Sequence, residues 1–148
     1  WMPHKFKLAV SGCPRNCAEA TIKDFGVVCV DSGYELHVGG NGGIKVRATD
    51  LLCNVATEKE VMEYCGAFIQ FYREDAHYLE RTAPWVERIG LSKIKQIIVE
   101  DVQKRQYYYQ RFLESQQISQ IDPWQERSSG GVAKHEFAAI KVVNAQPA

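Results

Sequence analysis

Two cysteines four positions apart are the residues of this chain best suited to chemistry. Cys13 and Cys17 follow a largely apolar, strand-like run at residues 6–10 and precede a run with helical character. Iron clusters in proteins are held by cysteine thiolates, usually four of them. The pair therefore predicts half of a metal-cluster site, and no second close pair of cysteines supplies the other half.

The residues around the pair predict a strand, a turn and a helix. Residues 6–10 alternate in polarity, which is typical of a strand, and Gly12 interrupts the pattern. Asn16 has the character of an N-cap, with Glu19 three residues later as in a capping box. We therefore expect a helix over residues 17–24, whose first N–H groups would stabilise thiolates and an anionic cluster.

Arg15 lies between the two cysteines and adds a fixed positive charge. A guanidinium there suits a carboxylate-rich cofactor or an anionic substrate. The spacing alone leaves alternatives open, because two buried thiols or a chance pair are also compatible with it. A zinc site needs two further ligands, and a thioredoxin-type redox motif has two intervening residues rather than three.

The other three cysteines have patterns typical of structural thiols. Cys29 lies in an apolar run, Cys65 lies on an apolar helical stripe, and Cys53 follows Leu52. Small buried thiols pack as apolar groups. We expect none of the three to bind a metal.

The remaining pattern predicts an α+β fold, a small mixed β-sheet covered by helices. A capping box at Thr57 and Glu60 opens a helix with an apolar stripe that reaches Tyr72. Strands are expected at residues 27–30, 34–38 and 44–47, and further helices at 84–89, at 93–99 and after residue 101. We expect one domain over residues 1–118 and an irregular C-terminal tail over residues 119–148.

A glycine-rich loop separates the second and third of these expected strands. Residues 39–43 read Gly-Gly-Asn-Gly-Gly. The pattern favours a flexible hairpin turn, with a backbone that closely approaches a cofactor as the alternative. It matches neither a dinucleotide fingerprint nor a P-loop.

Composition excludes several classes of protein. The chain has 148 residues, 45% of them apolar, and its 18 basic and 18 acidic residues balance. There is no basic run to bind nucleic acid and no stretch of about 18 apolar residues to span a membrane. Five cysteines without a secretory signal favour a cytoplasmic protein with reduced thiols. Because the chain starts at Trp1 and enters a strand almost at once, we expect a piece of a larger protein.

The run at residues 11–20, followed by residues 23–28, resembles the second cysteine motif of the sirohaem-dependent nitrite and sulfite reductases. The likeness is greatest to the large subunit of the assimilatory NAD(P)H-dependent nitrite reductases. Residues 2–7 and 78–81 also look like that subunit. The resemblance implies the 4Fe-4S domain fold of this family, of which the chain would be the C-terminal part.

The resemblance also implies cofactors and ligands. In the family four cysteines hold a 4Fe-4S cluster, and the last of them bridges it to the iron of sirohaem. Cys13 and Cys17 would be the metal ligands, Cys17 the bridge, and Arg15 and Asn16 would line the sirohaem site. No catalytic residue is assignable in this chain, because the upstream cysteines and the basic substrate-binding residues lie outside it.

The activity implied for the whole protein is the six-electron reduction of nitrite to ammonia. Electrons would pass from NAD(P)H through FAD and the cluster to sirohaem, within a large subunit that pairs with a small subunit. We expect this chain alone to be inactive and to lack both cluster and sirohaem. A sulfite reductase, or a non-enzymatic interaction domain with buried structural cysteines, is the alternative.

Overall fold

The computed structural model describes residues 1–120 and 122–129 of the chain. The backbone divides into two compact units, Trp1–Ser115 and Gln116–Ala148. The first unit contains every strand that the structure describes. In the second, the structure describes the end of α4 and the helix α5 (Pro123–Ser128), and residues 130–148 of the expected tail lie outside the described residues. The expected boundary at residue 118 stays a prediction.

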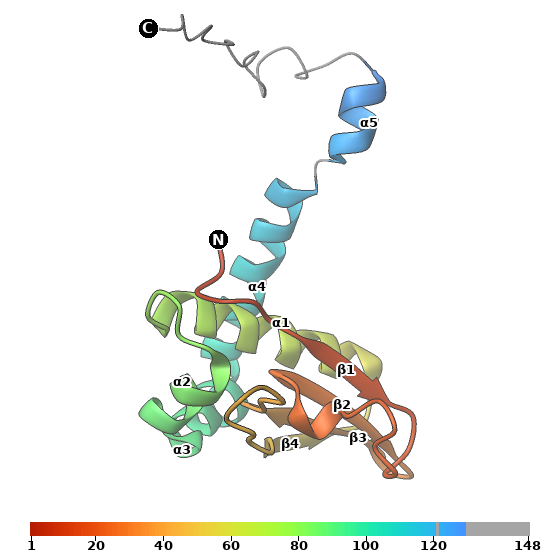
Figure 1. Ribbon diagram of the computed structural model, residues 1–148, viewed down its shortest axis with the longest axis vertical. Helices are drawn as coiled ribbons and strands as arrows, with labels where there is room; N and C mark the ends of the chain where they lie inside the picture. The colour runs from red at the N-terminus through yellow and green to blue at the C-terminus, as the bar shows by residue number, and fades with distance from the viewer. Residues whose placement is uncertain (121, 130–148) are drawn as a thin grey trace, which may run out of the picture. The chain divides into compact units, whose positions relative to one another are not determined.

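A four-stranded mixed sheet forms the centre of the first unit (Figure 1). Its strands lie side by side in chain order. β1 pairs in parallel with β2, and the other neighbours are antiparallel. This arrangement confirms the α+β fold with a small mixed sheet. The strands are β1 (Leu8–Ser11), β2 (Phe25–Val30), β3 (Gly33–Val38) and β4 (Asp50–Val55).

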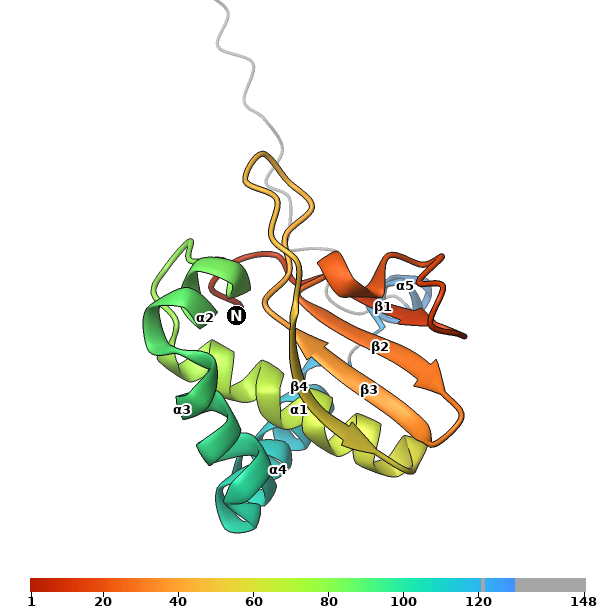
Figure 2. The same ribbon diagram turned by 90° about the horizontal axis from the view of Figure 1, so that it is seen from below.

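The strand expected at residues 44–47 is wrong. This segment forms an exposed loop with a single bridge between Asn41 and Arg47, and Ile44 and Val46 face solvent. The loop extends beyond the end of the sheet in Figure 2. An alternating pattern makes a strand only where one face is buried, and here the burial begins at β4.

Helices follow β4 along the chain. They are α1 (Glu58–Asp75), α2 (Thr82–Ile89), α3 (Leu91–Lys95), a π-helical turn η2 (Gln96–Glu100) and α4 (Val102–Ser119). The expected capping box is confirmed: Glu60 N–H donates to the Thr57 hydroxyl over 3.3 Å, and Thr57 N–H donates to the Glu60 carboxylate over 2.9 Å. The helix expected at residues 93–99 begins earlier, after Gly90, and widens into η2.

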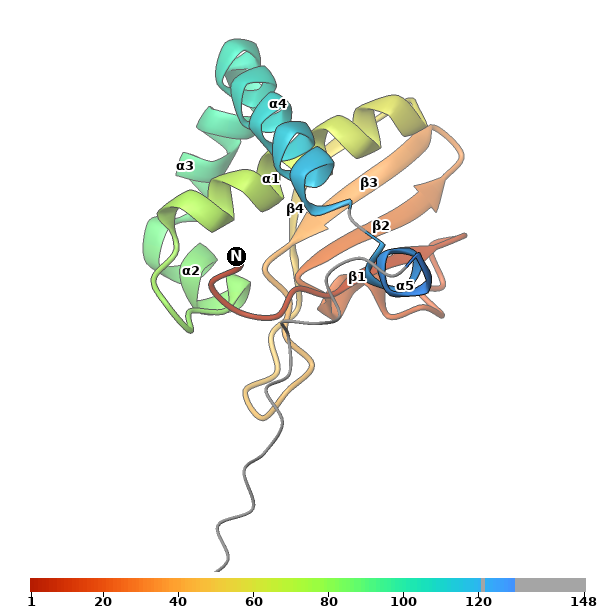
Figure 3. The same ribbon diagram turned by 90° about the horizontal axis from the view of Figure 1, so that it is seen from above.

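The hydrophobic core lies between the sheet and α1, which covers one face of it (Figures 1 and 3). Phe68 and Tyr72 of α1 are completely buried, as the apolar stripe predicts. Trp85 of α2 closes one end of the core, with its ring about 5 Å from those of Phe68, Phe71 and Tyr72. The sheet contributes Phe25, Val27, Leu36, Val38, Leu52 and Val55.

A buried carboxylate joins three segments at the start of β2. Asp24 is completely buried and accepts the backbone N–H of Lys7 over 2.8 Å. Arg81 donates to both of its oxygens over 2.9 and 3.1 Å, and the Thr82 hydroxyl donates as well. A buried charge is tolerated only when it is paired and hydrogen-bonded. Asp24 therefore fixes the approach to β1 and the start of α2 against β2.

Candidate metal and cofactor site

The cysteine loop, residues 12–19, connects β1 to a short 3₁₀ helix, η1 (Ala20–Ile22). Its two cysteines, Cys13 and Cys17, are exposed and carry free thiols. Two successive turns shape it, since Asn16 N–H donates to the Cys13 carbonyl over 3.2 Å and Glu19 N–H donates to the Asn16 carbonyl over 2.8 Å. The loop lies at the end of the sheet where β1 ends (Figure 2).

Asn16 is the residue that holds the loop. Its backbone is left-handed, with φ of 56°, a conformation that Asn tolerates better than most residues. Its side-chain carbonyl lies 3.2 Å from the hydroxyl of the buried Ser11 and 3.3 Å from Thr21 N–H. Its amide donates to the Thr21 hydroxyl over 2.6 Å. The side chain thus ties the end of β1 to η1 across the loop.

The helix expected at residues 17–24 is wrong. Glu19 also adopts a left-handed backbone, with φ of 55°, and only the three residues of η1 are helical. Asn16 is therefore no N-cap, and the expected stabilisation of thiolates by a helix N-terminus does not apply. Its side chain bonds across the loop to Thr21 instead of capping a helix. Local side-chain bonds of this kind compete with helix formation.

Two glycines allow η1 to pack closely against the sheet. A Cβ atom at Gly26 in β2 would lie 2.0 Å from the Ala20 carbonyl oxygen, and one at Gly40 would lie 2.6 Å from the carbonyl carbon of Ile22. The glycine-rich loop also donates from Gly40 N–H to the Lys23 carbonyl over 2.9 Å. In its first half, this loop thus approaches the protein's own backbone, a role that sequence reasoning missed.

The cysteine loop supplies two potential metal ligands. In the described part of the chain, no cluster of three or more cysteine, histidine or acidic side chains has the geometry to hold a metal ion. Two exposed thiols on one loop fit half of a four-thiolate cluster site. Arg15 is exposed beside them and makes no ion pair within residues 1–120 and 122–129.

The other cysteines have different surroundings. Cys53 and Cys65 pack partly buried against the core, and burial raises the pKa of Cys53 to about 11 and that of Cys65 to about 12. A thiol that stays protonated is a poor metal ligand. Cys29 is half-buried in β2. These surroundings agree with the structural role that the sequence pattern favours.

Among the described residues, no helix combines the length and apolar character needed to cross a bilayer.

A family model for the nitrite and sulphite reductase 4Fe-4S domain matches residues 1–106. The chain belongs to this family. The chain is similar to the NAD(P)H nitrite reductase of Bacillus subtilis, with 56% identity over 124 residues. This match covers 84% of the chain and 15% of that protein.

Two other relatives differ in the substrate that their names state. The nitrite reductase (NADH) large subunit of Escherichia coli is 43% identical over 101 residues, covering 67% of this chain and 12% of that protein. An assimilatory-type sulfite reductase of Nitratidesulfovibrio vulgaris is 34% identical over 97 residues, covering 66% of this chain and 44% of that protein. The chain spans less than half the length of each of these three relatives.

Proposed function

We propose that this chain is part of a sirohaem-dependent assimilatory nitrite reductase. The reaction takes one nitrite, six electrons and eight protons to one ammonium ion and two water molecules. The observation that carries the proposal is the pair of exposed, free thiols, Cys13 and Cys17, on one loop of a domain from the nitrite and sulphite reductase family. The 56% identity to an NAD(P)H nitrite reductase favours nitrite as the substrate.

In this proposal Cys13 and Cys17 would hold a 4Fe-4S cluster, and Cys17 would be the thiolate that the cluster shares with sirohaem. When bound, these groups supply the storage and transfer of electrons to the substrate. The chain's own part is to hold both sulfurs on one exposed loop. The remaining two thiolates come from elsewhere in the whole protein.

Arg15 and Asn16 have different parts in the proposed sirohaem site. The Arg15 guanidinium is exposed and would bind a carboxylate of sirohaem or the anionic substrate. The Asn16 side chain is already bonded to Ser11 and Thr21. Asn16 would therefore act by fixing the shape of the loop, with only its backbone free to face the cofactor.

The proposal extends to the whole protein. Because the chain spans 15% of the length of its Bacillus relative, the flavin and nicotinamide sites would lie in other parts of the large subunit. NAD(P)H would be the electron donor, FAD the flavin, and a small subunit the partner of this large subunit in the cytoplasm. The isolated chain, with two of the four thiolates, would be inactive and free of both cluster and sirohaem.

Replacing the loop cysteines in the whole protein tests the proposal. We expect Cys17→Ser to abolish both the bound iron and the sirohaem absorbance, and Cys13→Ser to abolish the cluster. Cys29→Ser is the matched control, because Cys29 is a half-buried thiol outside the loop. Full iron and sirohaem content in Cys17→Ser would refute the ligand assignment.

A sulfite reductase is the second candidate, supported by the 34% identity to an assimilatory-type sulfite reductase. The ratio of kcat/KM for nitrite and for sulfite, measured on the whole protein, decides between the two substrates. The third hypothesis, an interaction domain with structural cysteines, requires Cys13 and Cys17 to be buried. Both are exposed, which argues against it.

A further inference from the structure

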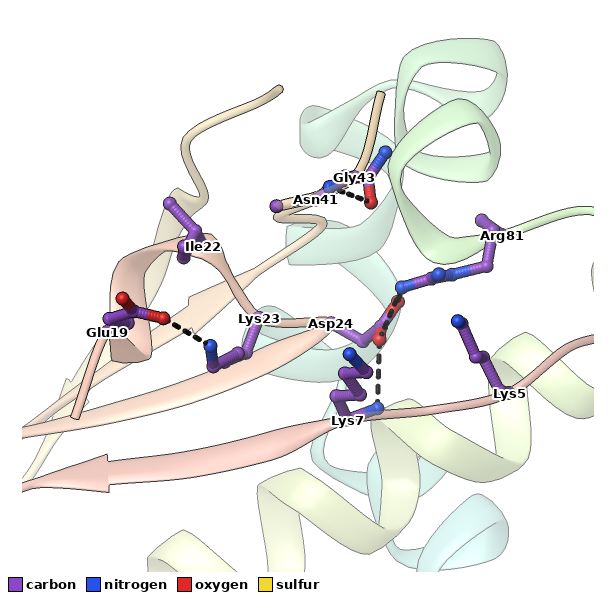
Figure 4. Close-up of a pocket in the computed structure, with 10 residues that line it drawn as sticks. Lys5, Lys7, Glu19, Ile22, Lys23, Asp24, Asn41, Gly43 and Arg81 are labelled. Atoms are coloured by element: carbon purple, nitrogen blue, oxygen red, sulfur yellow. Dashed lines mark hydrogen bonds and ion pairs between the residues drawn. The ribbon is translucent and has the colours of Figure 1, made fainter. Parts of the chain in front are cut away.

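A cavity of about 240 Å³ lies beside the starts of β1 and β2, and Glu19, the last residue of the cysteine loop, lines it. It opens between the segment that leads into β1, η1 and the glycine-rich loop, with Arg81 on one side (Figure 4). The cysteine loop follows the end of β1, whereas Lys5 and Lys7 of the cavity precede its start. The lining residues are Lys5, Lys7, Glu19, Ile22, Lys23, Asp24, Asn41, Gly42, Gly43 and Arg81.

The acidic groups of this cavity are already neutralised. Asp24 is bonded to Arg81, and Glu19 forms an ion pair with Lys23 over 2.9 Å. Both carboxylates therefore already have a cationic partner. Two ammonium groups, those of Lys5 and Lys7, have no carboxylate partner within residues 1–120 and 122–129.

These cations converge on one region of the cavity. Figure 4 shows the side chains of Lys5 and Lys7 extending toward Asp24 and the Arg81 guanidinium. The Nε atom of Arg81 is buried without an acceptor, the only side-chain nitrogen or oxygen in the described part of the chain with this property. A buried donor without a partner is costly, so Arg81 is held in place by its bonds to Asp24 and not by any bond at Nε.

We propose that this cavity binds a phosphate group. Two ammonium groups and a guanidinium approach from different directions, an arrangement that suits a tetrahedral oxyanion with several acceptor oxygens. A planar carboxylate is best bound by a guanidinium whose two N–H edges are both free. One terminal nitrogen of Arg81 already donates to Asp24, so Arg81 is less suited to a second carboxylate. Gly42 and Gly43 leave the outer wall free of side chains. Neither Cys13 nor Cys17 lines this cavity.

Titration of the 148-residue chain with inorganic phosphate, followed by calorimetry and by amide chemical shifts, tests this site. We expect saturable binding, with shifts concentrated at the backbone of Gly42, Gly43 and Lys7. Lys7→Gln and Lys5→Gln should each weaken binding roughly tenfold, because each removes a charged donor. Lys59→Gln is the matched control, since Lys59 is exposed in the first turn of α1 and should leave the affinity unchanged.

A fourth variant gives an effect of opposite sign. Glu19→Gln removes the carboxylate that pairs with Lys23 and adds a third free ammonium to the cavity, so that we expect tighter phosphate binding. Glu19 is exposed, so its replacement removes no core contact. Circular dichroism verifies that each variant is folded. Adenosine 5′-monophosphate serves as a second probe: tighter binding than inorganic phosphate assigns a nucleotide phosphate, and equal binding assigns free phosphate.

Two results would overturn the proposal. One is the lack of saturable binding when sodium chloride of equal ionic strength is the reference. The other is an equal loss of affinity in Lys7→Gln and Lys59→Gln, which would show only non-specific attraction to positive charge. Neither result depends on whether Cys13 and Cys17 bind a metal. The failure of this site is therefore distinguishable from the failure of the proposed reductase function.

Discussion

The chain holds its cysteines in two contrasting regions, the exposed cysteine loop and the core side of the sheet. Cys13 and Cys17 lie in a loop fixed mainly by the Asn16 side chain, with their thiols free. Cys53 and Cys65 pack between β4, α1 and the core, and their pKa values are raised by burial. The same side chain is therefore exposed to solvent in one region and packs as an apolar group in the other.

The reactivity of the thiols gives the largest expected contrast. With its pKa raised to about 12, Cys65 has roughly a thousandfold less thiolate near neutral pH than a thiol with the ordinary value of 9.0. We expect iodoacetamide to modify the exposed Cys13 and Cys17 much faster than Cys65 in the folded chain, because burial both blocks access to Cys65 and keeps its thiol protonated. Peptide mass spectrometry at timed intervals measures the rates. In urea, which unfolds the chain, the three rates should become similar. Equal rates in the native state would contradict the division into two regions.

Stability gives the next contrast, in the opposite direction. Phe68 is completely buried at the centre of the core, and Phe68→Ala should lower the free energy of unfolding by about 3–5 kcal/mol. Cys13→Ala and Cys17→Ala remove exposed side chains and should change it by no more than about 0.5 kcal/mol. Urea unfolding monitored by tryptophan fluorescence provides both values. A large loss on either cysteine replacement would assign the loop a structural role.

These two regions also differ in how well the sequence predicts them. The capping box of α1 was predictable because its signal and its hydrogen bonds lie within four residues, Thr57 to Glu60. The helix expected at residues 17–24 failed because the cross-loop bonds of Asn16 set its backbone instead. The packing of Gly26 on Ala20 and of Gly40 on Ile22 depends on contacts between separate segments, and the chain pattern contains no signal for them.

For the candidate site, the sequence predicts the two thiols but not the contacts that hold the surrounding segments in place. The spacing of Cys13 and Cys17 and the preceding strand pattern were sufficient to predict a two-thiol loop at the end of β1. The burial of Asp24 and its pairing with Arg81 could not be predicted, because 57 positions separate the two residues. The cavity beside them is likewise a product of tertiary structure.

Alkaline pH should destabilise the core region through its buried thiols. Cys65 remains protonated in the folded chain up to about pH 12, whereas an unfolded chain loses this proton near pH 9.0. The folded state thus binds more protons above pH 9, and stability falls as pH rises from 9 toward 12. At about pH 10.5 the loss from Cys65 is about 2 kcal/mol.

Cys65→Ala is the control for this pH dependence. Unfolding free energies of the two proteins at several pH values, each referred to its own value at about pH 8, isolate the contribution of the thiol. We expect a shallower fall in the variant, with Cys53 and Tyr72 causing the remaining slope because burial also raises their pKa values. Parallel curves for the two proteins would contradict the buried assignment of Cys65.

The last prediction concerns the backbone of the cysteine loop itself. Asn16→Ala removes the side-chain bonds to Ser11 and Thr21 and places a less tolerant residue at φ of 56°, so that we expect a loss of about 1–2 kcal/mol. Asn16→Gly loses the same bonds but accepts the left-handed backbone, and should be the more stable of the two variants. Urea unfolding compares their stabilities, and alkylation rates of Cys13 and Cys17 report the shape of the loop. If alanine and glycine behaved alike, the backbone conformation of Asn16 would contribute nothing, and the side-chain bonds alone would hold the loop.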